Sequence, residues 1–211
     1  MSYSVKEIFF TLQGEGANSG RAAVFCRFAG CNLWSGREPD RSSAICRFCD
    51  TDFVGTGGVG GGSFADAGTL AARVRAVWGD RGGGHRLVVL TGGEPLLQAG
   101  PELVAALHEQ GFSVALETNG TIAAPDGIDW ICVSPKAGSE IVQRRGDELK
   151  LVYPQQGISP ELCEHWKFHH FFLQPMDGPR RRENTEAAAR YCMQRPQWRL
   201  SLQTHKIAGF P

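Results

Sequence analysis

The sequence lacks an excess of charge of either sign. Lys and Arg together number 22, as do Asp and Glu, so the formal net charge at pH 7 is zero. Strongly basic surfaces attract nucleic acids and anionic membranes, so this balance gives no reason to expect either partner. The chain also lacks an apolar run close to the roughly 20 residues of a membrane-spanning helix.

The first ten residues, MSYSVKEIFF, lack the basic segment and apolar core of a secretory signal peptide. We therefore expect a cytoplasmic protein, in a reducing compartment where cysteines bind metals or act in catalysis more often than they form disulfides. Seven cysteines are present, an odd number. Four of them lie among apolar residues or in helical patterns and are expected to be buried hydrophobic side chains, namely Cys26, Cys132, Cys163 and Cys192.

The other three cysteines are grouped. Fourteen residues separate Cys31 from Cys46, and two separate Cys46 from Cys49. A structural zinc site uses four protein ligands, whereas a site with three keeps one position open, and no fourth cysteine or histidine lies close by in sequence. The spacing alone fits equally well a [4Fe–4S] cluster with one free iron and a zinc knuckle whose fourth ligand comes from elsewhere.

The length and the apolar content of 42% predict one domain, over residues 1–211, with a substantial core. Short apolar strands alternate with helical segments, which is typical of a parallel α/β sheet. We expect strands at 22–29, 86–90, 112–116, 130–133, 148–153, 170–173 and 198–202, and helices at 69–78, 101–110, 160–166 and 184–195. The connections 118–129 and 135–147 contain little helix-forming sequence, so helices should be fewer than strands.

A glycine-rich segment, residues 55–68, formally matches the G-x-G-x-x-G pattern of dinucleotide sites through Gly55, Gly57 and Gly60. No strand precedes it, and the glycines continue through Gly62 instead of opening a helix. We interpret the segment as a flexible loop.

Polar segments follow four of the expected strands. They are TGGEP (91–95), ETNG (117–120), SPK (134–136) and QPMD (174–177). Ligands of α/β folds bind at the carboxyl ends of the strands. Each segment alone could be an ordinary loop, but four at corresponding positions indicate a binding site.

Two features near the N-terminus are ambiguous by themselves. Arg27 interrupts an apolar strand, where an arginine needs a partner, so it either pairs with a carboxylate or binds an anion. Residues 13–16, QGEG, are either a simple turn or a place where glycine lets the backbone approach a ligand closely.

In combination, these motifs resemble the radical S-adenosylmethionine (SAM) enzymes and, among them, the family that makes 7-carboxy-7-deazaguanine from a carboxypterin. The resemblance rests on LQGEG (12–16), the three cysteines followed by Asp50-Thr51, the four strand-end segments and QTHK (203–206). The usual superfamily spacing is C-x3-C-x2-C, and family members with a lengthened cluster loop would accommodate the gap here. The resemblance implies a partial (β/α) barrel with a mostly parallel sheet.

The resemblance also implies a reaction. Cys31, Cys46 and Cys49 would hold a [4Fe–4S] cluster, SAM would bind its open iron, and a 5′-deoxyadenosyl radical would take a hydrogen from 6-carboxy-5,6,7,8-tetrahydropterin. Ring contraction with loss of ammonia would give 7-carboxy-7-deazaguanine, a queuosine precursor, so the enzyme would be a carbon–nitrogen lyase. A flavodoxin-like reducing partner and a homodimer are implied as well.

The resemblance assigns roles to residues that match the family's motifs. Gly93 and Glu94 would meet the amino group of SAM and Glu117 its ribose, within a SAM site of Gly93, Glu94, Glu117, Ser134, Pro135, Lys136, Gln174, Pro175, Met176 and Asp177. Thr51 would bind Mg²⁺, with Asp50 as the alternative ligand. The pterin site would comprise Leu12, Gln13, Gly14, Glu15, Arg27, Thr91, His205 and the carboxylate of Pro211, although a terminal residue more often frays.

Two other functions remain compatible with parts of the sequence. A radical SAM activating enzyme that makes a glycyl radical on another protein would share the cluster and the GGEP turn, but would have no reason to carry LQGEG or QTHK. A zinc-binding interaction module would explain the cysteines but would leave the strand-end motifs without a role. Iron and sulfide, as against zinc, would separate these alternatives.

Overall fold

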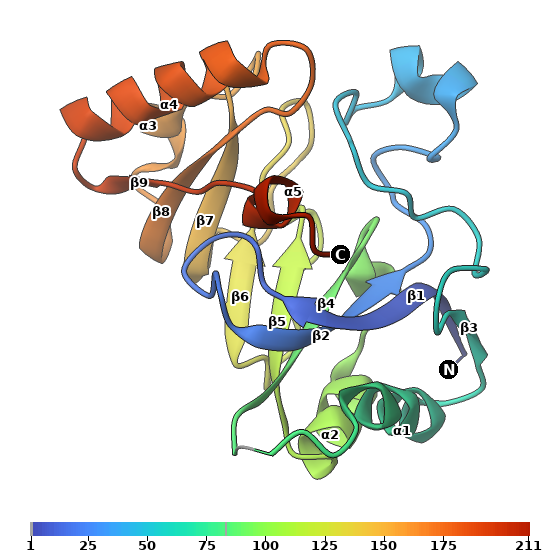
Figure 1. Ribbon diagram of the computed structural model, residues 1–211. Coiled ribbons are helices and arrows are strands. Elements are labelled where there is room, and N and C mark those ends of the chain that lie inside the picture. Colours follow the sequence, from blue (N-terminus) through green and yellow to red (C-terminus); the bar gives the residue numbers. More distant parts are fainter. Residues whose placement is uncertain (1, 83) are drawn as a thin grey trace.

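The computed structural model describes residues 2–82 and 84–211. These residues form a nine-stranded sheet with the order β3-β1-β2-β4-β5-β6-β7-β8-β9 (Figure 1). Neighbours from β2 to β9 run parallel, while β1 is antiparallel to both β2 and β3, which confirms a mostly parallel sheet. The strands are β1 Tyr3–Leu12, β2 Ala22–Phe28, β3 Gly62–Phe64, β4 Arg86–Gly92, β5 Phe112–Thr118, β6 Trp130–Val133, β7 Arg145–Tyr153, β8 Lys167–Pro175 and β9 Trp198–Leu200.

Helices are fewer than strands in the described chain, as predicted. They are α1 Ala67–Trp78, α2 Pro101–Glu109, α3 Pro160–Cys163, α4 Arg181–Gln194 and α5 Thr204–Ala208, with short 3-10 helices η1 Glu38–Ser43 and η2 Pro95–Leu97. In Figure 1, α1 and α2 lie together beside one part of the sheet, and α3 and α4 beside the other. Each pair covers its own apolar cluster, one from β1, β2, β4 and β5 and one from β6 to β9.

The alternation along β4 shows how the sheet positions a site. Val88 and Leu90 are fully buried in the cluster under α1 and α2. Leu87 and Val89 point to the opposite face, where they join a smaller buried cluster. Side chains two residues apart share a face of a strand, so Thr91 continues this second face at the carboxyl end of β4.

The prediction of a flexible loop over 55–68 is wrong for part of this segment. Residues 62–64 form β3, which pairs with the start of β1. A Cβ atom on Gly58 or Gly61 would overlap the carbonyl oxygen of Lys6, so glycine is required here by close approach to β1. The glycines therefore pack the edge of the sheet, and α1 begins only at Ala67, capped by Asp66.

Further elements were not expected, among them the ten-residue strand β1 and the short η2. Residues 38–43 form the helix η1 inside the cysteine loop, and 204–208 form α5, which lies in front of the strands in Figure 1. Both are too short to show a helical repeat. Cys26, Cys132 and Cys163 are buried as predicted, Cys192 is half-buried, and all seven cysteines are free. None of the helices in the described residues combines the length and apolar character needed to cross a bilayer.

Candidate active site

A cavity of about 390 Å³ lies at the carboxyl ends of the parallel strands. Every residue that the sequence predicts for the cluster, Mg²⁺, SAM or the pterin lines it, except Glu94 and Pro135. The strand-end segments therefore meet in one place, as expected for an α/β sheet. The predicted residues on the wall are Leu12, Gln13, Gly14, Glu15, Arg27, Cys31, Cys46, Cys49, Thr51, Thr91, Gly93, Glu117, Ser134, Lys136, Gln174, Pro175, Met176, Asp177, His205 and Pro211.

The three clustered cysteines face this cavity together. The backbone N–H of Leu33 donates to Cys31 Sγ over 3.4 Å. A hydrogen bond from Cys46 lowers the pKa of Cys49 to about 6, and giving that hydrogen bond, together with burial, raises the pKa of Cys46. One thiolate is thus already favoured at neutral pH, which suits a metal-binding role.

The spacing of these sulfurs bears on the kind of metal. With Zn–S bonds of about 2.3 Å, tetrahedral ligands lie about 3.8 Å apart. Among the described residues, the three cysteines do not form a group whose ligand atoms all lie within 4.8 Å of one another; only Glu117, Cys132 and Glu148 do. The three sulfurs as they stand are thus not arranged around a single tetrahedral zinc ion, although Cys46 and Cys49, which hydrogen-bond to each other, lie close together.

The long loop between Cys31 and Cys46 is ordered by its own side chains. The Arg41 guanidinium lies 4.0 Å from the ring centroid of Trp34 and donates to Glu38. Its Nη1 also donates to the carbonyl oxygens of Arg47 and Cys49, at 2.9 and 3.0 Å. Arg41 thereby fixes the backbone that carries the Cys46–Cys49 pair.

In the GGEP turn, Glu94 is the one predicted site residue that does not line the cavity. Gly93 leaves no room for a Cβ against the Gly30 carbonyl, so the turn touches the strand that leads into Cys31. Glu94 is fully buried, and its carboxylate accepts hydrogen bonds from Thr118 Oγ1 at 2.9 Å, the Asn119 N–H at 2.8 Å and the Leu96 N–H at 2.9 Å. It ties the TGGEP and ETNG turns together and is not part of the cavity wall. Burial raises its pKa despite these bonds.

The SPK segment presents a lysine to the cysteines. The Lys136 ammonium donates to the carbonyl and hydroxyl oxygens of Ser134, at 2.6 and 2.7 Å. Burial lowers its pKa, and the nearby sulfurs of Cys46 and Cys49 oppose this shift. Pro135 lies behind the wall, where its carbonyl accepts from Gln155.

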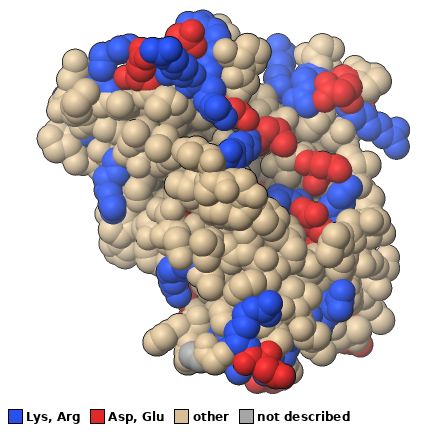
Figure 2. All heavy atoms as spheres, in the orientation of Figure 1, with Lys and Arg blue, Asp and Glu red and all other residues tan. Residues whose placement is uncertain are grey.

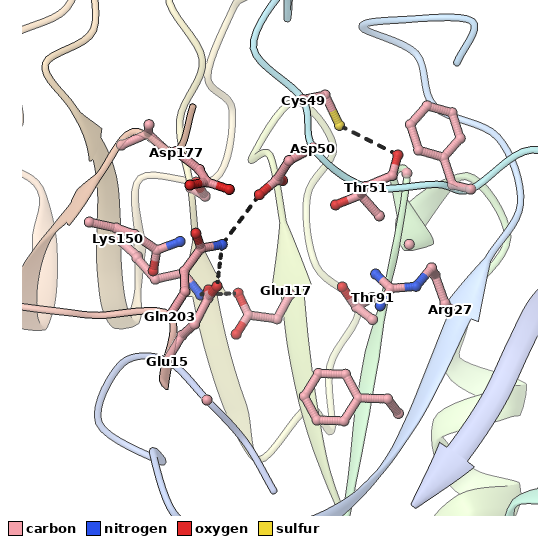
Figure 3. Close-up of a pocket in the computed structure, with 18 of the residues that line it drawn as sticks. Glu15, Arg27, Cys49, Asp50, Thr51, Thr91, Glu117, Lys150, Asp177 and Gln203 are labelled. Carbon is pink, nitrogen blue, oxygen red and sulfur yellow. Dashed lines mark hydrogen bonds and ion pairs between the residues drawn. The ribbon is translucent and has the colours of Figure 1, made fainter. Parts of the chain in front are cut away.

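A buried ion group forms the floor of the cavity (Figure 3). Lys150 Nζ lies 2.7 Å from Glu15 Oε2 and 2.8 Å from Glu117 Oε2, and Gln203 donates to Glu15 Oε1 at 3.1 Å. Burial would lower the pKa of Lys150, but the surrounding acidic groups outweigh it and raise that pKa well above its usual value. Sequence reasoning missed Lys150, although a single lysine inside the apolar strand ELKLVY is the same signal that Arg27 gave.

The QGEG segment packs closely against two neighbours, His205 of α5 and Glu148 of β7. The Gly14 carbonyl accepts from Thr204 N at 3.0 Å and from its Oγ1 at 2.9 Å, and a Cβ on Gly14 would overlap the His205 ring. Gly16 has φ of 64° and leaves no space for a Cβ against the Glu148 carboxylate. The segment is therefore the docking site of α5, and this contact brings His205 to the cavity.

Arg27 forms the ion pair that was one of its two predicted roles, and anion binding stays a prediction. Its Nε lies 2.7 Å from Glu7 Oε1, which confirms the ion pair. Among the described residues this is its only hydrogen bond, so both terminal nitrogens are available to a ligand at the cavity wall. At the same wall the Pro211 carbonyl oxygen accepts from Thr11 Oγ1 at 2.6 Å, so the terminal segment is tucked in.

Lys206 of α5 connects the cluster loop to the QPMD segment. Its Nζ lies 2.5 Å from Asp50 Oδ2 and 2.6 Å from Asp177 Oδ2. The Asp50 carboxylate is thus already engaged, whereas no hydrogen bond of the Thr51 hydroxyl is found among the described residues. Figure 2 shows acidic and basic side chains intermixed on this face of the molecule, with no large area of one sign.

Comparisons with known proteins agree with this geometry. Residues 41–148 match the Radical SAM superfamily, a match that begins inside the long loop, after Cys31. The chain is 64% identical over 211 residues to a 7-carboxy-7-deazaguanine synthase of Bordetella pertussis, covering all of both chains. It is 65% identical over 209 residues to the synthase of Bradyrhizobium diazoefficiens, covering 99% of each.

A solved structure has the same architecture. The crystal structure of QueE from Escherichia coli superimposes with a TM-score of 0.72 at 27% identity, covering 96% of this chain and 94% of that one. Family membership carries with it a [4Fe–4S] cluster and SAM, and the three cysteines on the cavity wall fit that cluster. The chain therefore belongs to the radical SAM superfamily and, within it, to the 7-carboxy-7-deazaguanine synthase family.

Proposed function

We propose that this protein converts 6-carboxy-5,6,7,8-tetrahydropterin into 7-carboxy-7-deazaguanine with loss of ammonia. The observation that carries the proposal is the single cavity that joins three clustered cysteines to a set of groups suited to a carboxypterin. The relatives that bear this enzyme's name match the whole length of the chain. The cluster and SAM, when bound, supply the radical that starts the reaction by removing a hydrogen from the substrate.

The SAM half of the site uses the ends of β4 to β8. Gly93 lets a ligand's amino group approach the backbone, and Glu117 accepts from the ribose hydroxyls. Ser134, Lys136 and the segment 174–177 complete the wall. Glu94 supports the wall indirectly, because its carboxylate holds together the two turns that carry Gly93 and Asn119.

The pterin half uses β1, β2 and α5. The free nitrogens of Arg27 suit a bidentate contact with the substrate carboxylate. Glu15 can accept from the amino and ring N–H groups of a pterin. Burial lowers the pKa of His205, so its ring is neutral at pH 7 and can serve as donor or acceptor. Leu12, Gln13, Gly14, Thr91 and the Pro211 carboxylate complete this half of the proposed site.

Mg²⁺ is a further part of the proposal. The Thr51 hydroxyl and the substrate carboxylate are oxygen ligands of the kind that this ion prefers, with water in its remaining positions. Asp50 is the less suitable ligand because Lys206 already holds its carboxylate.

The test is product analysis by mass spectrometry. Anaerobically reconstituted, reduced protein receives SAM, Mg²⁺ and the carboxytetrahydropterin, with the Cys49→Ala variant as control. We expect 7-carboxy-7-deazaguanine from the wild type alone. If 5′-deoxyadenosine forms without that product, the substrate assignment is wrong; if neither forms on protein with a full cluster, the proposed activity is wrong.

The proposal includes the molecule's setting. We infer a single domain over 1–211, a homodimer, a flavodoxin-like electron donor and a reducing cytoplasm, since an iron–sulfur cluster on free thiols needs reducing conditions. Light scattering coupled to gel filtration tests the dimer, and reduction of the cluster by purified flavodoxin tests the donor.

A further inference from the structure

We propose that Lys150 is a positioning residue that joins the two halves of the site, so that binding of SAM and binding of the pterin strengthen each other. The inference rests on the proposed function for the assignment of Glu117 to the SAM ribose and Glu15 to the pterin. Lys150 itself belongs to neither motif.

The geometry places one ammonium between two carboxylates from distant parts of the chain. Lys150 lies on β7, Glu117 near the end of β5, and Glu15 after β1, and Figure 3 shows the three side chains converging. The lysine side chain is 5% exposed and each of the two carboxylates 17%. The ion pairs, at 2.7 and 2.8 Å, are therefore shielded from water and from salt.

The surroundings make Lys150 hard to replace. Glu148 and Cys132 lie beside Glu117, with their ligand atoms within 4.8 Å of one another. Burial and the neighbouring acidic groups raise the pKa of Glu117, with Lys150 opposing the shift. Without the ammonium, two or three buried carboxyl groups would face one another, and some would take up a proton or turn away.

The coupling follows from this shared partner. Hydrogen bonds from the ribose hydroxyls would fix Glu117 in its charged form, which in turn fixes Lys150. An ordered Lys150 holds Glu15 in the orientation that the pterin needs, so the second ligand meets a site that is already arranged. The same coupling must act in the reverse direction, because linkage between two binding equilibria is reciprocal.

The first experiment measures coupling without turnover. Pterin is titrated calorimetrically into oxidised, cluster-loaded protein, with and without saturating SAM. We expect SAM to tighten pterin binding at least about 5-fold in the wild type, the lower end of typical couplings. In Lys150→Met, which keeps the length of the side chain but not its charge, the ratio should fall close to one. Lys167→Met, an exposed lysine on the neighbouring strand, should keep the wild-type ratio.

The second experiment avoids changing the lysine. Glu15→Gln removes one partner of Lys150 from the pterin half, and we expect SAM to bind at least about 3-fold more weakly although no pterin is present. Unchanged SAM affinity would overturn the proposal even if Lys150→Met failed to fold. The proposal would also be overturned if SAM did not change the pterin affinity of the wild type, or if SAM tightened pterin binding in Lys150→Met as much as in the wild type. A wild type that binds neither ligand would instead contradict the proposed function.

Discussion

At the scale of single residues, several positions are set by what lies against them. Gly14 and Gly16 are glycines because His205 and Glu148 occupy the space that a Cβ would need. Glu94 is a carboxylate because three donors from two turns converge on it. Both cases fix the position of neighbours that face the cavity.

Gly14→Ala should weaken pterin binding about 10-fold. The added methyl group would displace the His205 ring, and 1.4 kcal/mol of lost binding corresponds to a factor of ten in affinity. The measurement is calorimetric titration of the pterin into cluster-loaded protein. Gly57→Ala is the matched control, since a Cβ there meets nothing within 4 Å. Equal affinities for the two variants would show that His205 does not depend on Gly14.

Glu94→Ala should lower the free energy of unfolding by at least about 3 kcal/mol. The change leaves the Thr118 hydroxyl and the N–H groups of Leu96 and Asn119 without their acceptor, and each unpaired buried group costs about 1–3 kcal/mol. Glu94→Gln keeps the shape and should cost less. Urea denaturation of cluster-free protein measures both. A stable Glu94→Ala protein that has lost only SAM binding would favour a direct contact with SAM.

Glu15 should make stability depend on pH. Burial acts to raise its pKa, but Lys150, together with the hydrogen bond from Gln203 and the nearby His205, outweighs burial, and the pKa lies below the ordinary value of 4.5. A carboxyl with a depressed folded-state pKa stabilises the fold above its unfolded pKa, and this contribution is lost as the pH falls through the folded pKa. The stability difference between wild type and Glu15→Gln should therefore shrink as the pH falls below about 4.5. Denaturant titrations from pH 6 to pH 3.5 measure it, and a constant difference would contradict the prediction.

At the scale of elements, the cysteine loop and α5 are short segments held by specific contacts. The loop depends on Arg41, which stacks on Trp34 and donates to the carbonyl of Cys49. The helix α5 depends on Thr204 and Lys206, which bind Gly14, Asp50 and Asp177. Neither of the two short helices, η1 in the cysteine loop and α5, contains a buried residue.

Arg41→Lys should release the cluster to a chelator about 10-fold faster than the wild type. Lysine keeps the charge but loses the planar fork that binds Glu38 and the loop carbonyls together. Mutation of residues that hold the metal ligands from the outer shell typically lowers metal affinity 10- to 100-fold. Iron release to a ferrous chelator measures the effect, with the exposed Arg37→Lys as control. If both variants release iron at the same rate, Arg41 does not hold the cysteine pair.

These elements also show what a sequence can predict. Strands such as 86–90 and 112–116 were located because apolar side chains leave a repeat that can be counted, and the polar segments after them marked the cavity. By contrast, α5, η1 and β3 depend on contacts with other parts of the chain, and they are too short to show a repeat of apolar side chains in the sequence. Lys150 did leave a local signal, a lone lysine in an apolar strand, but its two partners lie 33 and 135 positions away in the sequence, so its role could not be predicted.

At the scale of the whole molecule, the site and the cores are separate. The apolar clusters under the two pairs of helices contain none of the three cluster cysteines. The cavity takes residues from six strands, β1, β2, β4, β5, β7 and β8, but the strands are held together by packing elsewhere. The sheet thus provides a frame that does not depend on the metal.

Removal of the cluster should therefore leave the fold intact. Cluster-free protein is expected to keep its far-ultraviolet circular dichroism, while amide exchange should increase mainly in residues 31–51. Hydrogen exchange followed by mass spectrometry, on chelator-treated and reconstituted samples, makes the comparison. Loss of protection throughout β4 to β8 would show that the cluster stabilises the whole sheet.

The order of the strands has a consequence for how the chain folds. From β4 to β9 each strand lies beside the one before it in the sequence, so the sheet can grow by addition of one neighbour at a time. The contact between Gly14 and Thr204 closes a loop of about 190 residues and waits for that growth to finish. Because α5 has no buried residue and is held by polar contacts of Thr204 and Lys206, we expect the same closure to break first when the native state opens. A ligand that bridges QGEG and α5 would then slow this first opening step, and protect the chain kinetically before it changes the stability of the sheet.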